Sequence, residues 1–187
     1  MFLKVWRFVA IMLAALMLGL GFCHLMQLPA RMAWDQYLWV GSTVQGGLYA
    51  TFGSVGALID VAAVIVVGLL AYFVKEHRRP GCCLALIAAL AFALALLLWW
   101  IVVYPVNVQL ATWVNGPVPD DWTRWRGRWE WGHAAIALIE LVGFAALVWS
   151  VLEDGPVMEP VVKAVTAVRK PAPARTKPKR RPPARRT

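Results

Sequence analysis

Apolar residues are concentrated in four long stretches, and the segments between them, together with the C-terminal tail, carry nearly all of the charged residues. The stretches cover residues 6–25, 54–74, 82–104 and 133–152. Each is about 20 residues long, which is the length of α-helix that crosses roughly 30 Å of hydrocarbon. A soluble helical bundle would carry charged stripes on its outer faces, whereas the window 84–103 contains no charged residue. The pattern therefore predicts an all-α protein, a four-helix transmembrane bundle.

Composition agrees with this prediction, because 60% of the residues are apolar and charge is confined to short segments. The first stretch has the basic start of a secretory signal. However, residues 21–26, which follow its apolar run, contain no small-x-small cleavage site. We therefore expect this stretch to be retained as the first span.

The distribution of Lys and Arg predicts the orientation, because short basic loops remain in the cytoplasm. Fifteen of the 19 basic residues lie on one side of the spans, ten of them in the C-terminal tail, and four lie on the other side. Those four are Arg31, Arg124, Arg126 and Arg128. We therefore expect a multi-pass protein of the cytoplasmic (inner) membrane with both termini in the cytoplasm. The loops of residues 26–53 and 105–132 would then lie outside.

The composition changes abruptly to Pro, Ala, Lys and Arg after the last span. This change divides the chain into a transmembrane domain, residues 1–152, and a tail, residues 153–187. Such a tail cannot bury a core, so we expect it to be disordered. It could contact anionic lipid headgroups, at about 1 kcal/mol per basic residue, or serve only as a topology anchor. We do not expect nucleic acid as its partner, although counterion release would permit such binding.

Five polar residues lie within or at the ends of the predicted spans, all toward the outer side. Asp60 and Glu140 fall inside the second and fourth spans, on the order of 10 Å below the outer surface at ~1.5 Å per residue. His24 ends the first span, Asn107 follows the third, and His133 opens the fourth. Ionisable groups are costly in hydrocarbon, so they usually face the bundle interior and mark a functional site. We therefore predict a polar pocket in the outer leaflet.

Helical spacing places both carboxylates on inward faces. Positions 53, 56, 57 and 60 are spaced i, i+3, i+4 and i+7, so Asp60 shares a stripe with small residues, where membrane helices touch. His133 and Glu140 share a face of the fourth span, and Glu130 joins it if the helix starts a turn early. Two carboxylates in a low dielectric cannot both be ionised at little cost. At least one should be protonated, or paired with a histidine or an outer arginine.

The same residues raise the question of a metal or haem site. The spacing Glu130-x-x-His133 resembles half of a carboxylate-bridged metal site, but the sequence has no second copy on another helix. We therefore expect no metal and no cofactor. A haem held by His24 and His133 is an alternative, because imidazoles on different helices can ligate haem. A structural role, as a hydrogen bond across helices, is also open to each residue taken singly.

The outer loops are rich in aromatic residues. Trp122, Trp125 and Trp129 are spaced i, i+3 and i+7, which predicts one face of a short helix lying in the membrane interface. Arg124 and Arg128 would turn away from that face. The tryptophans could form an aromatic belt or a stacking platform for an aromatic ligand. In both cases we expect ordered loops that cover the polar pocket.

Two short motifs resemble a known family. Pro-Val-Asn-Val-Gln-Leu at 105–110, followed by Trp122 and by Arg-Trp-Glu-Trp-Gly-His at 128–133, is similar to the small four-span membrane proteins that include the anthrone oxygenases. Asn107, Trp129 and His133 match the family's Asn at the end of the third span and its Trp and His at the start of the fourth. The resemblance covers residues 8–152 and not the tail. Many relatives carry an Arg three residues after that His, where this chain has Ile136.

The resemblance implies a cofactor-independent oxygenase that converts tricyclic phenolic anthrones to anthraquinones with dioxygen. His133 would be the general base, Asn107 would donate a hydrogen bond to the developing oxyanion, and Trp129 would stack on the substrate. Glu130 or Glu140 would orient the imidazole. The remaining pocket residues would be His24 and Asp60.

The competing interpretation is a non-catalytic accessory or assembly subunit, whose polar groups bind a neighbouring chain or a lipid. A small haem or metal redox protein is a further alternative. Transport is less favoured, because four spans without an internal repeat lack the usual means of alternating access. The sequence leaves open whether the chain forms a homo-oligomer or joins a larger membrane complex.

Overall fold

The structure, a computed structural model, describes residues 1–45 and 48–153. Within these residues the chain forms helices and no β-strand. Four helical segments are long and apolar enough to cross a membrane, which confirms the predicted all-α bundle of a multi-pass membrane protein. They are Phe2–Ala33, Tyr49–Glu76, Cys82–Thr112 and Trp122–Glu153. Apart from Glu153, which ends the last helix, the tail predicted to be disordered lies outside the described residues.

Two of the spans are single helices and two contain a π-helical turn. The first span is α1 (Phe2–Ala33), and the fourth is α7 (Trp122–Glu153). The second span runs through α3 (Leu48–Thr51), the π-helical turn η2 (Phe52–Gly56) and α4 (Ala57–Glu76). The third span runs through α5 (Cys82–Leu98), the π-helical turn η3 (Trp99–Val103) and α6 (Tyr104–Thr112). Between α1 and α3 lie α2 (Gln36–Val40) and the π-helical turn η1 (Gly41–Gln45).

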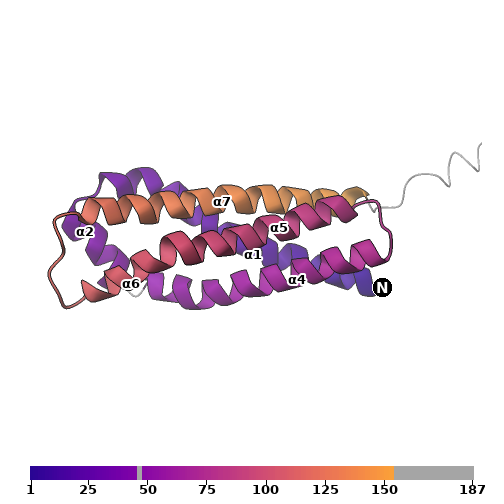
Figure 1. Cartoon of the computed structure of the whole chain (residues 1–187), viewed down its shortest axis with the longest axis horizontal. Helices are drawn as coiled ribbons and strands as arrows, with labels where there is room; N and C mark the ends of the chain where they lie inside the picture. The colour runs from indigo at the N-terminus through magenta and orange to yellow at the C-terminus, as the bar shows by residue number, and fades with distance from the viewer. Residues whose placement is uncertain (46–47, 154–187) are drawn as a thin grey trace, which may run out of the picture. The chain divides into compact units, whose positions relative to one another are not determined.

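The four spans pack in a closed ring in which each contacts two neighbours (Figure 1). Helix α1 packs against α4 and α7, and α5 packs against the same two helices. Successive spans run in opposite directions, as in an up-and-down four-helix bundle. The chain therefore begins at one end of the bundle, and α2 and α6 lie at the opposite end, here called the loop end (Figure 1). That the loop end faces outward stays a prediction from the charges.

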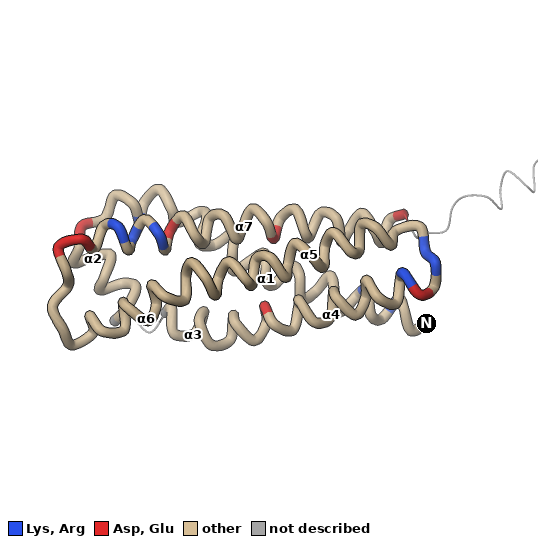
Figure 2. Tube along the Cα trace, in the orientation of Figure 1, with Lys and Arg blue, Asp and Glu red and all other residues tan. Residues whose placement is uncertain are grey.

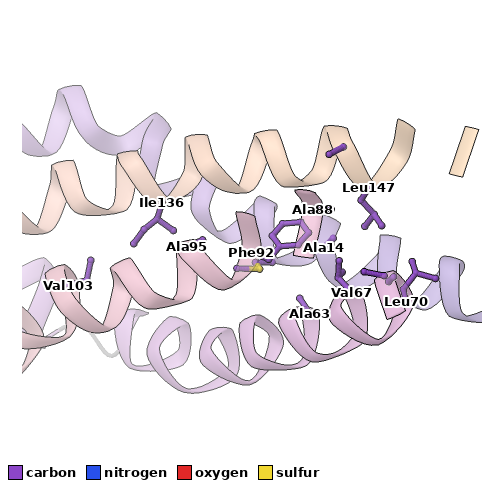
Figure 3. Close-up of a cluster of buried hydrophobic side chains, with 14 of the residues drawn as sticks. Ala14, Ala63, Val67, Leu70, Ala88, Phe92, Ala95, Val103, Ile136 and Leu147 are labelled. Carbon is purple, nitrogen blue, oxygen red and sulfur yellow. The ribbon is translucent and has the colours of Figure 1, made fainter. Parts of the chain in front are cut away.

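Small residues allow the spans to approach one another closely. The buried residues of α1 recur at alternating intervals of four and three, namely Ala10, Ala14, Met17, Gly21, His24, Leu28 and Arg31. This alternation keeps one narrow stripe facing the partner helices. Ala63, Ala88 and Ala95 of the neighbouring helices belong to the same buried cluster as Phe92 (Figure 3). Large apolar side chains such as Leu90 lie on the outside, as expected where lipid is the solvent.

All four spans extend further toward the loop end than the hydropathy pattern predicts. Helix α1 continues past residue 25 to Ala33, and α7 begins at Trp122 instead of residue 133. Hydropathy marks only the length in hydrocarbon, and a helix can continue beyond it. The prediction of a separate short interfacial helix is wrong, because Trp122, Trp125 and Trp129 lie in the first turns of α7. The loop predicted at residues 105–132 shrinks to residues 113–121.

A proline inside the third span is compensated by a side chain from the fourth. Pro105 has no N–H, so the carbonyl of Ile101, four residues earlier, cannot receive its usual helical hydrogen bond. The Arg128 guanidinium donates to that carbonyl at 2.7 Å and to the carbonyl of Val102 at 3.0 Å. The same region of the helix adopts the π-helical turn η3. Arg128 therefore provides hydrogen bonds to backbone carbonyl groups of the third span instead of only facing solvent.

Charged residues gather at the two ends of the bundle (Figure 2). The apolar parts of the spans contain two acidic side chains, Asp60 on α4 and Glu140 on α7. Asp60 is partly exposed, whereas Glu140 is buried. Uncompensated charge is costly in hydrocarbon, so two such side chains within the spans indicate a candidate functional site between α4 and α7.

Candidate functional site

A cavity of about 400 Å³ lies within the loop-end half of the bundle, lined by residues of all four spans and of η1. Its volume falls within the ~300–1,000 Å³ typical of small-molecule sites. Six of the seven residues that the sequence singles out line this cavity, namely His24, Asp60, Asn107, Trp129, His133 and Glu140. The seventh, Glu130, lies behind the wall. The structure thus brings the predicted pocket residues together, while their functional role stays a prediction.

Two histidines from different helices meet at the cavity wall. His24 of α1 and His133 of α7 are each 8% exposed, and their ring centroids lie 4.2 Å apart at an interplanar angle of 33°. His133 Nδ1 lies 2.9 Å from the carbonyl oxygen of Trp129, one helical turn earlier. A carbonyl can only accept, so Nδ1 carries the proton, and in the neutral ring Nε2 is left as an acceptor. His133 therefore has the tautomer of a general base.

The histidine contact does not fit a haem held by these two rings. Axial ligands approach the iron from opposite faces of the macrocycle, which must lie between them. Rings already in contact leave no space for it. Nor do the described residues contain a group of three or more His, Cys, Asp or Glu side chains placed to hold a metal ion.

Aromatic rings surround the histidine pair. Trp129 lies 4.1 Å from His133 and 5.2 Å from His24, measured between ring centroids. Tyr49 stacks on His24 at 5.7 Å, and Phe52 meets the same imidazole edge to face at 5.6 Å. All three aromatic residues line the cavity. Such walls suit a flat aromatic ligand, because stacked and edge-to-face contacts add to the free energy gained by burial.

Asn107 is oriented by the same tryptophan. The Trp129 indole Nε1–H donates to Asn107 Oδ1 at 2.9 Å. An indole N–H can only donate, so the amide oxygen must be the engaged end, and the amide N–H groups are the end that can donate to a ligand. This geometry agrees with the predicted role of Asn107 as a donor to an oxyanion.

Three polar atoms at the cavity have no hydrogen-bond partner within the described part of the chain. They are His24 Nδ1, Asp60 Oδ1 and Glu140 Oε2, each of them buried. The residue that carries Oε2, Glu140, is only 3% exposed. A buried polar atom without a partner costs on the order of 1–3 kcal/mol, so this arrangement favours a ligand that offers complementary groups.

Glycine makes room for one of these carboxyl groups. A Cβ atom added at Gly21 of α1 would collide with Glu140 Oε2 and would lie 3.3 Å from the Cα of Ala137. Gly56 likewise meets Leu20 of α1 at 3.3 Å, but a Cβ at Gly53 would meet nothing within 4 Å. The predicted stripe of small residues is therefore only partly a helix contact. All four of its residues, Gly53, Gly56, Ala57 and Asp60, also line the cavity.

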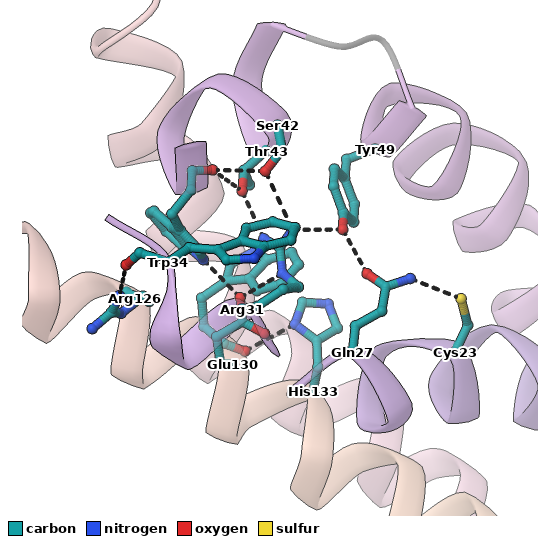
Figure 4. A network of polar contacts seen from close by, with 12 residues as sticks. Cys23, Gln27, Arg31, Trp34, Ser42, Thr43, Tyr49, Arg126, Glu130 and His133 are labelled. Carbon is teal, nitrogen blue, oxygen red and sulfur yellow. Dashed lines mark hydrogen bonds and ion pairs between the residues drawn. The ribbon is translucent and has the colours of Figure 1, made fainter. Parts of the chain in front are cut away.

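A buried ion pair supports the wall from behind. Arg31 of α1 is 0% exposed, and its Nε donates to Glu130 Oε1 of α7 at 2.7 Å (Figure 4). Its other nitrogens donate to Tyr49 Oη and to Thr43 Oγ1, each at 2.7 Å. The indole of Trp39 also donates to Glu130 Oε1, at 2.7 Å. Arg31 of α1 thus connects α7, through Glu130, with η1 and α3, whose residues Thr43 and Tyr49 line the cavity.

The guanidinium of Arg31 is also enclosed by aromatic rings. Its Cζ lies 4.9 Å from the ring centroids of Tyr49 and Trp129, 5.1 Å from that of Trp34 and 5.9 Å from that of Trp39. Cation–π contacts strengthen when the cation is desolvated, as it is here. Arg31 therefore holds the two wall residues Tyr49 and Trp129 in place.

No protein-family model, no curated protein and no solved structure matches this chain.

Two sequence predictions change at this cluster. The hydropathy pattern places Arg31 in the loop of residues 26–53, whereas in the structure it lies in α1 and is fully buried. Its spacing of seven residues from His24 was the signal that could have revealed it. Glu130 was expected, with Glu140 as the other candidate, to orient the imidazole. Instead Glu130 bonds to Arg31 and Trp39, and the imidazole of His133 is oriented by the Trp129 carbonyl.

Proposed function

We propose that this protein is a membrane-embedded, cofactor-independent oxygenase that acts on a hydrophobic aromatic substrate of the anthrone type. The observation that carries the proposal is the tautomer of His133 within an aromatic cavity. Its Nδ1–H is committed to the Trp129 carbonyl, so Nε2 can accept a proton in apolar surroundings. The resemblance of Asn107, Trp129 and His133 to the anthrone oxygenases supplies the reaction class.

The chemistry needs a base, an oxyanion stabiliser and dioxygen. His133 Nε2 removes a proton from the methylene carbon between the two aryl rings, and the electron pair of that C–H bond delocalises onto the ketone oxygen. The resulting anion is the reductant. It adds dioxygen at the same carbon, and the resulting peroxide anion takes the proton back from His133 Nε2 to form a hydroperoxide. The hydroperoxide then loses water to leave the second ketone. One dioxygen is thus consumed and one water released for each anthrone converted to an anthraquinone.

Asn107 and Trp129 have separate roles in this scheme. The amide N–H of Asn107 donates to the oxyanion, a type of stabilisation that is strong when water is excluded. Trp129 stacks on the substrate and fixes the amide through its own N–H. Asp60 and Glu140 pair with phenolic hydroxyl groups of the substrate, because each has a buried oxygen without a partner in the described residues. These two acids therefore select phenolic substrates.

The test uses the full-length protein in lipid nanodiscs with 1,8-dihydroxyanthrone under air. Anthraquinone formation is followed by absorbance and dioxygen uptake with an electrode, against protein-free nanodiscs because anthrones oxidise slowly unaided. Substitution His133→Ala should lower the protein-dependent rate by about 10²- to 10⁴-fold, the usual range for a general base. The matched control is His77→Ala, because His77 Nδ1 also contacts a carbonyl one turn earlier, at 2.7 Å, but His77 is exposed at the other end of the bundle.

Two results would overturn the proposal. One is a wild-type rate no higher than that of protein-free nanodiscs, which would favour the accessory-subunit interpretation. The other is unchanged turnover in the His133→Ala protein, which would remove His133 as the base.

A further inference from the structure

The rim of the cavity lies on the side of the bundle, between the second and third spans. Helices α4 and α5 pack closely against each other. Within the described residues, the loop-end segments of the same two spans, α3–η2 and η3–α6, are not among the closely packed pairs. Lining residues on both borders of this gap are exposed, namely Ala50, Gly53 and Val61 on the second span and Trp100, Ala111 and Val114 on the third side.

This rim is apolar apart from one indole N–H group. The six exposed lining residues include no charged or hydrogen-bonding group apart from the indole of Trp100. Five of the six lie within the membrane-spanning segments. An opening toward water would leave such an apolar surface in contact with solvent, whereas an opening toward hydrocarbon desolvates no polar side-chain group of these six residues other than the Trp100 indole N–H.

Residues of η1 that are anchored by hydrogen bonds line the loop end of the cavity. Thr43 lines the cavity, and its hydroxyl accepts from Arg31 Nη2 and donates to the Trp39 carbonyl at 2.6 Å. Entry there requires breaking the buried network around Arg31. Entry across the side rim breaks no hydrogen bond described for the rim residues.

We infer that the cavity fills from the lipid, and that a flat, hydrophobic aromatic ketone or phenol enters between the second and third spans across Gly53. This inference rests on the proposed function for its substrate class and adds the route. Gly53 borders the gap, and a Cβ there would meet nothing within 4 Å. A larger side chain at this position would therefore project into open space and narrow the entrance.

The interior identifies an oxygen-bearing aromatic molecule and not a lipid acyl chain. An acyl chain would leave Glu140 Oε2, Asp60 Oδ1 and His24 Nδ1 without partners, at a cost for each buried group. Hydroxyl and carbonyl groups on an aromatic frame satisfy such atoms while the frame stacks on Trp129 and Tyr49. The aromatic wall and the unpartnered atoms thus select the same class of ligand.

The inference can be tested with benzophenone, a diaryl ketone that resembles an anthrone and forms covalent adducts with nearby C–H bonds on irradiation, preferentially at methionine. Two methionines of α1 give the readout. Met17 lines the cavity and is 1% exposed, whereas Met12 is 48% exposed on the outside of the bundle. Benzophenone dissolved in the nanodisc lipid should label both, and peptide mass spectrometry gives the ratio of Met17 to Met12 adducts.

Substitution Gly53→Leu should lower this ratio at least several-fold, because it narrows the entrance and leaves Met12 unaffected. The control is Gly68→Leu on the same span, since Gly68 does not line the cavity and a Cβ there also meets nothing within 4 Å. It should leave the ratio unchanged. Trp100→Ala removes the largest side chain of the rim, so it should widen the entrance and raise the ratio of Met17 to Met12 adducts. This variant provides the test if the Gly53→Leu protein does not fold.

Absence of Met17 adducts in the wild type would overturn the inference, as would an unchanged ratio in the Gly53→Leu protein. The outcome is separable from that of the proposed function. A ratio that falls in the Gly53→Leu protein, without anthrone turnover in the wild type, would support the lateral route and contradict the oxygenase. Turnover in the wild type with an unchanged ratio in the Gly53→Leu protein would support the oxygenase and contradict the route.

Discussion

Arg31 and Glu130 are separated by 99 positions in the chain, and they form an ion pair with 2.7 Å between Nε and Oε1. Each side chain is 1% exposed. Removing two charges from water is costly, and their attraction offsets that cost only when further hydrogen bonds satisfy the remaining donors and acceptors. Here Tyr49, Thr43 and Trp39 supply those bonds. The pair is therefore part of a larger buried network at the loop end, in which Glu130 Oε1 accepts from both Arg31 and Trp39.

Removing one member of this pair should be strongly destabilising. Arg31→Met leaves the Glu130 carboxylate buried without its cation, and we expect a loss of about 3–5 kcal/mol in the free energy of unfolding. Glu130→Met should cost a similar amount. The double substitution should be less destabilising than the sum of the two, because no unpaired charge is left. Unfolding of the four proteins by dodecyl sulfate in mixed micelles measures this difference, and strict additivity would show that the two residues act independently.

A second prediction concerns the space that Gly21 leaves for Glu140. Gly21→Ala places a methyl group where Glu140 Oε2 lies, so the carboxyl group must move, at an expected cost of about 1–3 kcal/mol. Gly19→Ala on the same helix should be close to neutral, because its Cβ would meet nothing within 4 Å. Thermal unfolding of the two variants gives the comparison.

The Glu140→Ala background shows whether that collision is the cause. Most of the penalty of Gly21→Ala should disappear there, since the colliding oxygen is gone. A penalty of the same size in both backgrounds would assign the effect to the nearby Cα of Ala137 instead.

The hydrogen bond from Trp129 to Asn107 should matter for turnover more than for folding. Trp129→Phe keeps an aromatic ring on the wall but removes the N–H that fixes the amide, so the stability cost should be only about 0.5–1.5 kcal/mol. We expect kcat/KM for anthrone to fall clearly in both Trp129→Phe and Asn107→Ala. The double variant should be scarcely worse than Asn107→Ala, because Trp129 acts on the oxyanion through Asn107. Multiplicative losses would mean that the two residues act separately.

The contact between Arg128 and the third span should contribute to the stability of the fold. Arg128→Ala removes the donors to the carbonyls of Ile101 and Val102 and should destabilise the fold by about 1–3 kcal/mol. Pro105→Ala restores a backbone N–H that can reach the Ile101 carbonyl. The loss on Arg128→Ala should therefore be smaller in the Pro105→Ala background, as measured by thermal unfolding. Equal losses in both backgrounds would separate Arg128 from the proline.

The sequence predicts the four spans and the meeting of the polar residues well, because both follow from fixed helical geometry. Asp60 and Glu140 lie at equal depth on spans of the same direction, and their spacing directs both inward. The network behind the wall could not be predicted in the same way. The hydropathy pattern predicts that the first helix ends before Arg31, so Arg31 is treated as a loop residue. Its place on the buried stripe of α1 is then not apparent. Partners in the predicted loop of residues 26–53, such as Thr43 and Tyr49, carry no sequence signal that links them to Glu130.

The order of synthesis gives the Arg31–Glu130 pair a further consequence. The ribosome makes Arg31 with the first span and Glu130 only at the start of the last, so the cation has no carboxylate until α7 emerges. Until then the hydroxyl groups of Thr43 and Tyr49, water and lipid headgroups are the partners open to its guanidinium, and none of these except a headgroup phosphate balances its charge. The buried network at the loop end is therefore complete in its charges only once α7 is in place.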